Sequence, residues 1–166
     1  MASIRFFVLL TLVLSACNPI KRLSDQEWDH YRALRVYMTD AEKKTYLKYK
    51  DQQDRDAYLQ KLGLWEKFYQ YPEDIRELIL TGDVARGWTK DKVLMAWGRP
   101  HDMQKLAGRE AYRSERYIYR FEELESGELV IWHKGSKTAY KAVRLFQRQV
   151  IFDDDVVSEM KEMKGW

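Results

Sequence analysis

Hydrophobic residues recur at helical spacing through the first part of the chain. Ser24–Glu27 has the spacing of a capping box, and apolar or aromatic residues follow it on one face at positions 28, 31, 34 and 38. Thr39–Glu42 repeats the capping box and predicts the start of a second helix. Apolar positions continue to Gly63, where a helix is expected to end, and one more short segment runs to residue 71. We therefore predict a helical subdomain over residues 24–71.

Two further helices are predicted between Pro72 and Pro100. The first covers about 73–81 and ends at Gly82, the second covers about 90–97, and each has its apolar residues on a single face. Glycine is expected at turns and helix ends where the backbone needs a positive φ. The residues that carry this pattern are Gly87 at the turn, Thr89 as the helix cap, Val93 and Trp97 as buried positions, and Gly98 and Pro100 as the helix stop.

From about residue 115 the hydrophobic period changes from helical to alternating. Tyr117, Tyr119 and Phe121 occupy every second position and predict a strand with an aromatic face. Residues 129–132 predict a second strand, residues 134–137 a turn, and residues 140–152 a long extended stretch. Asp153–Asp155 predicts an exposed turn without bound metal, leading into a last strand around residue 156. This order predicts an α+β fold, in which two helices after the helical segment pack on a three- to four-stranded antiparallel meander (ααβββ-like).

The amino-terminal sixteen residues have the three-part layout of a bacterial export signal. A short segment with one positive charge at Arg5 precedes the apolar run Phe6–Leu14, and small residues follow at once. The run is about half of the ~20 apolar residues that a membrane-spanning helix needs. Cys17 comes directly after the predicted cleavage site, and the segment Leu14–Cys17 resembles the lipobox of bacterial lipoproteins.

The lipobox resemblance implies an anchor and a destination. Residues 1–16 would be a signal peptide that is removed, and Cys17 would receive a diacylglycerol and an N-acyl chain. Residues 17–23 would then form a short lipidated tether that holds the protein in a membrane without a spanning helix. In enteric lipoproteins an aspartate directly after the cysteine causes retention in the inner membrane, and this chain has Asn18 there. The resemblance therefore implies the bacterial outer membrane, with the folded part on the periplasmic side.

Composition adds little chemistry to this picture. The full chain has 29 basic and 26 acidic side chains, and removal of the signal peptide with its single arginine leaves 28 basic ones. The mature chain is therefore nearly neutral, and its charge gives no indication of nucleic-acid binding. Cys17 is the only cysteine, and His30, His101 and His133 show no metal-ligand spacing. No phosphate-binding glycine loop or nucleophile elbow occurs in the sequence. We therefore expect no enzymatic activity, no metal, and no cofactor other than the covalent lipid.

Five motifs follow one another along the chain: Ile75–Gly82, Gly87–Val93, Trp97–Pro100, Tyr117–Phe121 and Val150–Val156. Together they resemble the SmpA/OmlA, or BamE-like, family of small outer-membrane lipoproteins over residues 75–160. The resemblance implies a BamE-like α+β domain over residues 72–166. It also implies a non-enzymatic scaffold that acts in outer-membrane protein assembly or in upkeep of the envelope. Trp97 stands where the family has leucine, and the segment 24–71 has no counterpart in the short family members.

A second resemblance involves the same region. Gly87–Asp91 followed by Trp97–Asp102 is similar to the GWxTD-motif domains of exported bacterial proteins. Here Lys90 separates the threonine from the aspartate, which departs from that motif.

Two functional hypotheses from different classes remain open at this point. The first is a lipoprotein that binds another envelope protein through Trp88, Tyr117, Tyr119 and Phe121. The second is a glycan- or peptidoglycan-binding module in which exposed aromatic rings stack on sugars. An apolar patch with a polar rim would indicate the first, and rings in a polar groove would indicate the second. The sequence leaves the identity of the partner and the oligomeric state open.

Overall fold

The computed structural model describes residues 19–133 and 142–166. The predicted signal peptide, Cys17 and Asn18, the turn at 134–137 and the beginning of the extended stretch at 140 lie outside the described residues. The described chain starts with the short 3₁₀ helix η1 (Pro19–Arg22). The α-helices are α1 (Asp25–Leu34), α2 (Asp40–Lys48), α3 (Gln52–Lys61), α4 (Leu64–Tyr69), α5 (Glu73–Thr81) and α6 (Lys90–Trp97). The strands are β1 (Asp102–Leu106), β2 (Ser114–Leu124), β3 (Leu129–Trp132), β4 (Ala142–Asp153) and β5 (Val156–Lys164).

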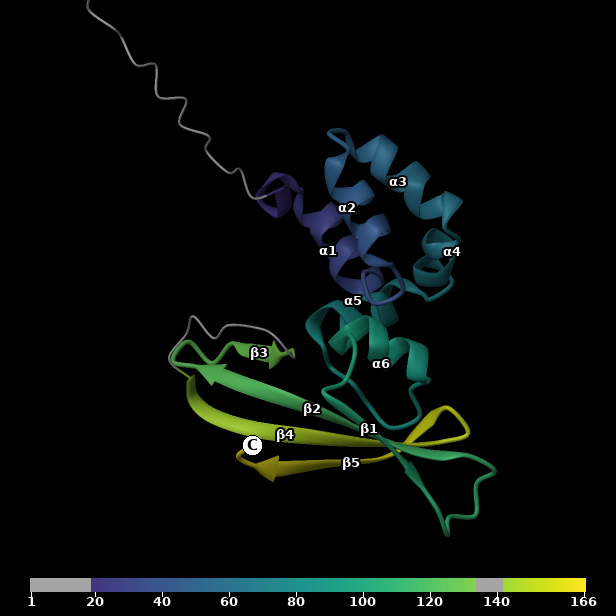
Figure 1. Cartoon of the computed structure of the whole chain (residues 1–166), viewed down its shortest axis with the longest axis vertical. Coiled ribbons are helices and arrows are strands. Elements are labelled where there is room, and N and C mark those ends of the chain that lie inside the picture. Colours follow the sequence, from purple (N-terminus) through teal and green to yellow (C-terminus); the bar gives the residue numbers. More distant parts are fainter. Residues whose placement is uncertain (1–18, 134–141) are drawn as a thin grey trace, which may run out of the picture.

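The helices lie on one side of an antiparallel sheet, with α5 and α6 next to the strands and α1–α4 beyond them (Figure 1). β4 pairs with β2 along one edge and with β5 along its other edge. The opposite edge of β2 is shared, because β1 pairs with its first half and β3 with its second half. The α+β fold with helices before an antiparallel sheet is confirmed. The sheet has five strands where three to four were expected, and β1 is the strand that the hydrophobic pattern did not predict.

The predicted helix starts are formed by the expected side chains. Ser24 and Thr39 both begin complete capping boxes, in which their backbone N–H groups donate to Glu27 and Glu42 at 2.7 Å. Thr89 does occupy the N-cap position of α6, but its side chain makes no capping hydrogen bond. Its backbone instead forms a bridge to Val156 at the start of β5, so this helix start is fixed by the sheet.

A layer of aromatic rings joins α6 to the sheet. Val93 is fully buried and Trp97 is 4% exposed, as predicted for this helix. The Trp97 ring meets Tyr119 and Phe121 edge-on, at centroid distances of 5.1 and 5.2 Å. Its indole N–H donates to the Gly82 carbonyl at 2.9 Å, which fixes the end of α5 over the same rings. Buried residues from α1–α4 belong to the same hydrophobic cluster, so the segment 24–71 and the α+β part share one core.

The helical part contains a buried ion pair that links three elements. Glu27 of α1 and Arg55 of α3 are both buried, and the Arg55 guanidinium donates to the Glu27 carboxylate. Arg55 also donates to the carbonyl of Tyr49 after α2, at 2.5 Å. Burial raises the pKa of Glu27, but the hydrogen bonds from Ser24 and Arg55 outweigh it and leave that pKa below its ordinary value. The carboxylate is therefore charged at neutral pH and depends on Arg55 for its partner.

Replacing Arg55 tests this dependence. Arg55→Met should lower the free energy of unfolding by about 3 kcal/mol, because Glu27 is left as an unpaired buried charge. The double variant Glu27→Gln/Arg55→Met should recover part of the loss, because glutamine keeps the capping box without the charge. Urea unfolding followed by circular dichroism measures both. A single variant as stable as the wild type would contradict the assignment.

Gly98 ends α6 in a conformation that favours glycine. Its φ is 73° and its ψ is −156°, a region that other residues rarely adopt. Its N–H donates to the Leu94 carbonyl at 2.8 Å, and its own carbonyl accepts from the Tyr119 hydroxyl at 3.2 Å, so this glycine connects the helix to the sheet. Gly87, at the predicted turn, also has a positive φ of 80°.

We expect Gly98→Val to reduce the free energy of unfolding by about 2 kcal/mol, because valine is strained at this φ and ψ. Ala85→Val is the matched control, since Ala85 is exposed in the same region and has no positive φ. Thermal unfolding of the two variants measures the difference. Equal melting temperatures would show that the backbone at Gly98 relaxes freely.

The turn predicted at Asp153–Asp155 occurs at that position, but the prediction that all three aspartates are exposed is wrong. Asp154 and Asp155 have φ values of 48° and 66° and connect β4 to β5. Only Asp154 is exposed, because the other two carboxylates are held by cations of the chain. Arg109 binds Asp153 through two hydrogen bonds of 2.7 and 2.9 Å and holds the pKa of that carboxyl well below its usual range. Asp155 pairs with Lys90 and Arg113, so this turn also holds the start of α6 against the sheet.

Candidate functional site

The residues predicted to form a protein interface are inside the core. Trp88, Tyr117, Tyr119 and Phe121 are all at most 8% exposed. Trp88 lies between α5 and α6, and the other three side chains lie on the face of β2 that the helices cover. On that face Trp97 packs on Tyr119 and Phe121, and the Lys90 ammonium lies over the Tyr117 ring at 5.5 Å. The prediction that these four side chains form a binding surface is therefore wrong. The alternation along β2 correctly separated two faces, but it did not show which face is covered.

Exposed aromatic rings are also scarce. Among the phenylalanine, tyrosine and tryptophan side chains that the structure describes, only Tyr112 is exposed, in the loop between β1 and β2. A single exposed ring offers no groove in which a sugar could stack. The other aromatic side chains within residues 19–133 and 142–166 are buried or half-buried.

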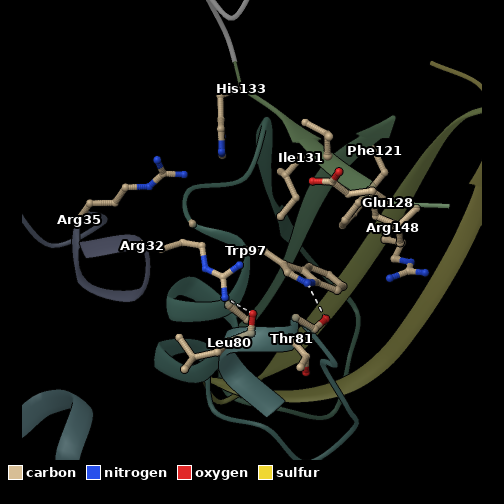
Figure 2. A pocket seen from close by; sticks show the side chains of 15 residues that line it. Arg32, Arg35, Leu80, Thr81, Trp97, Phe121, Glu128, Ile131, His133 and Arg148 are labelled. Atoms are coloured by element: carbon tan, nitrogen blue, oxygen red, sulfur yellow. Dashed lines mark hydrogen bonds between the residues drawn. The ribbon is translucent and has the colours of Figure 1, made fainter. Parts of the chain in front are cut away.

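The most distinctive concave feature is a basic cleft between the C-terminal ends of α1, α5 and α6 and the strands β2, β3 and β4. We define the basic cleft by Arg32, Arg35, His133 and Arg148, with Trp97 as its floor (Figure 2). Its cavity has a volume of about 310 Å³ and a single lining carboxylate, Glu128, which is exposed. A second cavity of about 270 Å³ adjoins it, since Arg35, Gly98 and His133 line both.

Two of the cleft arginines are neutralised or held by other groups. Arg32 donates to the carbonyl of Leu80 and lies 3.7 Å from the Asp29 carboxylate. Arg148 pairs with Glu162 at 3.3 Å, and its guanidinium lies over the Phe121 ring at 5.1 Å and the Trp97 ring at 5.7 Å. Both side chains are therefore fixed in place before any ligand arrives.

Arg35 is different, because no carboxylate in the described chain pairs with it. It is the C-cap residue of α1, and its N–H donates to Tyr31 at 2.9 Å, so its backbone is fixed. Its side chain is half-buried, and neither a hydrogen bond nor a salt bridge satisfies the guanidinium among the described residues. Burial lowers the pKa of Arg35, and the neighbouring Arg32 charge lowers it further. Arginine nevertheless stays protonated in proteins, so the cleft contains an unneutralised positive charge.

His133 completes the wall of the cleft opposite Arg35. Its ring lies above Gly98, where a Cβ atom would stand 3.5 Å from the imidazole Cε1. Burial lowers the pKa of His133, and the charge of Arg35 lowers it further. The imidazole is therefore neutral at pH 7, and it can donate or accept a hydrogen bond inside the cleft.

The three histidines do not converge on a metal site. His30 is buried in the helical part and bonds to the Tyr69 hydroxyl at 2.7 Å, while His101 lies beside Trp132 at a ring distance of 5.3 Å. His133 lies in the basic cleft. No cluster of three potential metal ligands occurs within the described residues.

Sequence reasoning missed the basic cleft because its residues come from separate elements. One local signal was available: Arg35 has no acidic residue three or four positions away on either side, where a helix would normally place its ion-pair partner. No helix of the described chain is both long enough and apolar enough to cross a membrane.

Comparison with known proteins returned no relatives. No family model, no curated protein and no solved structure matches the chain significantly. The resemblances to the SmpA/OmlA and GWxTD families therefore stay predictions.

The stability of arginine variants should distinguish the roles of these side chains. Arg35→Met should leave the free energy of unfolding unchanged or raise it, because methionine fills a similar volume without an unpaired charge. Arg32→Met should lower it by about 1 kcal/mol, because the hydrogen bond to the Leu80 carbonyl is lost. Urea unfolding curves measure both. If Arg35→Met were the more destabilised protein, Arg35 would have a structural partner and the interpretation would fail.

Proposed function

We propose that this chain is a lipid-anchored binding protein on the periplasmic side of the bacterial outer membrane, acting without catalysis in envelope or outer-membrane protein assembly. The anchor proposal rests on the lipobox-like segment that ends at Cys17. The structural observation that supports the anchor proposal is that the hydrophobic core begins only a few residues after Cys17. Ile20 and Leu23 already pack against the hydrophobic core, and the Leu23 N–H donates to Ile20 at 3.2 Å.

This position sets a short tether. Three residue steps separate Cys17 from Ile20, and an extended chain spans at most about 3.5 Å per residue. The folded body would then lie within about 10 Å of the lipidated sulfur. Lys21 and Arg22 are exposed on η1, where they could contact anionic headgroups.

The surface for a protein partner lies on the sheet face away from the helices. The register places Leu145 opposite Glu122 and Met163 opposite Gln147, on that outer face of the neighbouring strands β4 and β5. Leu145 is 40% exposed and Met163 is 49% exposed. This pair replaces the buried tyrosines as our candidate contact with another envelope protein.

The anchor is tested in the native host by changing Cys17 and the residue after it. Cys17→Ser should abolish incorporation of labelled fatty acid and release the protein from membranes, because no thiol remains for acylation. Asn18→Asp should keep the label but move the protein to the inner-membrane fraction of a density gradient, and Asn18→Gln is the matched control that should stay in the outer membrane.

The assembly role is measured in the same strains. A deletion strain carrying Cys17→Ser should contain fewer folded barrel proteins in its outer membrane than one carrying the wild-type chain. Unchanged barrel levels would refute the assembly role while leaving the anchor intact. A labelled Cys17→Ser protein would refute the anchor itself.

A further inference from the structure

We propose that the basic cleft binds a small, water-soluble phosphate monoester. The cleft belongs to the folded body, so this binding does not depend on whether Cys17 is lipidated. Figure 2 shows Arg32 and Arg35 entering from the α1 side, His133 pointing in from above, and Arg148 on the far side of Trp97.

The positive charge of the cleft favours binding of an anion. Arg32 and Arg148 already have carboxylates nearby, but Arg35 has none among the described residues. Arg99 lines the second cavity together with Arg35 but not the basic cleft, and it interacts electrostatically with the Asp40 carboxylate. Arg35 is therefore the cleft guanidinium that has no anionic partner in the described chain. A phosphate monoester carries a charge of about −1.5 to −2 at pH 7 and would supply that partner.

The hydrogen-bonding capacity leads to the same class of ligand. A guanidinium has five N–H donors arranged for bidentate contact with an oxyanion, and Arg35 uses none of them within the described chain. His133 is neutral at pH 7 and can supply one more donor from the opposite wall. An oxyanion between these groups would accept hydrogen bonds from donors that no described residue uses.

The shape of the cleft favours a small soluble molecule over a membrane surface. Its volume of about 310 Å³ is at the lower end of the range for small-molecule sites. Arg35 is recessed and half-buried, whereas a bilayer surface would meet only protruding side chains such as Arg99, which is exposed. The apolar side chains of Leu80, Trp97 and Ile131 line the same cavity and provide a place for the carbon part of an ester.

The test uses the purified full chain in uncharged maltoside micelles and phenyl phosphate as the probe. Isothermal titration calorimetry should show saturable binding of one probe per chain. Benzoate has the same ring but only one negative charge, and it should bind at least about tenfold more weakly. Doping the micelles with phosphatidylglycerol should not compete with phenyl phosphate.

Two variants connect the binding to the cleft. Arg35→Met should weaken phenyl phosphate binding at least about tenfold. Arg86→Met is the matched control, because Arg86 is exposed, lies outside both cavities and removes the same charge. Its affinity should equal that of the wild type.

A measurement on the unmodified chain keeps the test independent of how the variants fold. In NMR spectra, phenyl phosphate should shift the imidazole signals of His133 and leave those of His30, which lies in the helical part, in place. Absence of saturable binding, equal affinity for benzoate, equal loss in Arg86→Met, competition by phosphatidylglycerol, or shifts that spare His133 would each overturn the proposal.

Discussion

The contact between Trp97 and its surroundings holds the two layers of this fold together. One ring closes the end of α5 through the hydrogen bond to Gly82, and packs edge-on against Tyr119 and Phe121 of β2. The same ring is the floor of the basic cleft and lies beneath the Arg148 guanidinium. The position of α6 on the sheet and the shape of the cleft therefore both depend on this side chain. Any change that moves this ring would alter the core and the cleft together.

The charges of the molecule divide into two groups with different physical roles. Glu27 and Arg55, or Arg109 and Asp153, satisfy one another and join distant elements. Arg35 is half-buried beside the second positive charge of Arg32 and has no anionic partner in the described chain. Folding alone does not account for such a residue, because an apolar side chain of similar size would fit without the cost of desolvating a charge. A ligand that supplies the missing negative charge gives a physical reason for its presence.

Local signals in the sequence were sufficient for much of the fold. The capping boxes at Ser24 and Thr39 and the positive φ at Gly98 depend on a few adjacent residues, and the structure contains all of them. β1 was missed because its exposed residues show no alternation and it exists only by pairing with β2. The interface prediction failed for a related reason: an alternating strand shows that its faces differ, but only the tertiary packing decides which face the helices cover. The basic cleft required side chains from α1, β3 and β4 to meet, and no local pattern records that.

The divided edge of β2 also affects how this protein can behave among copies of itself. A long unpaired edge strand is a template on which another chain can add a strand and begin to aggregate. Here that side of the sheet ends in two short pieces, β1 and β3, each of at most five residues. The opposite side ends in β5, and the C-terminal half of that strand carries the charged residues Lys161, Glu162 and Lys164. Lipid-anchored proteins would be confined to two dimensions and would collide edge to edge far more often than in free solution. Short and charged borders would let such molecules remain separate on a crowded surface.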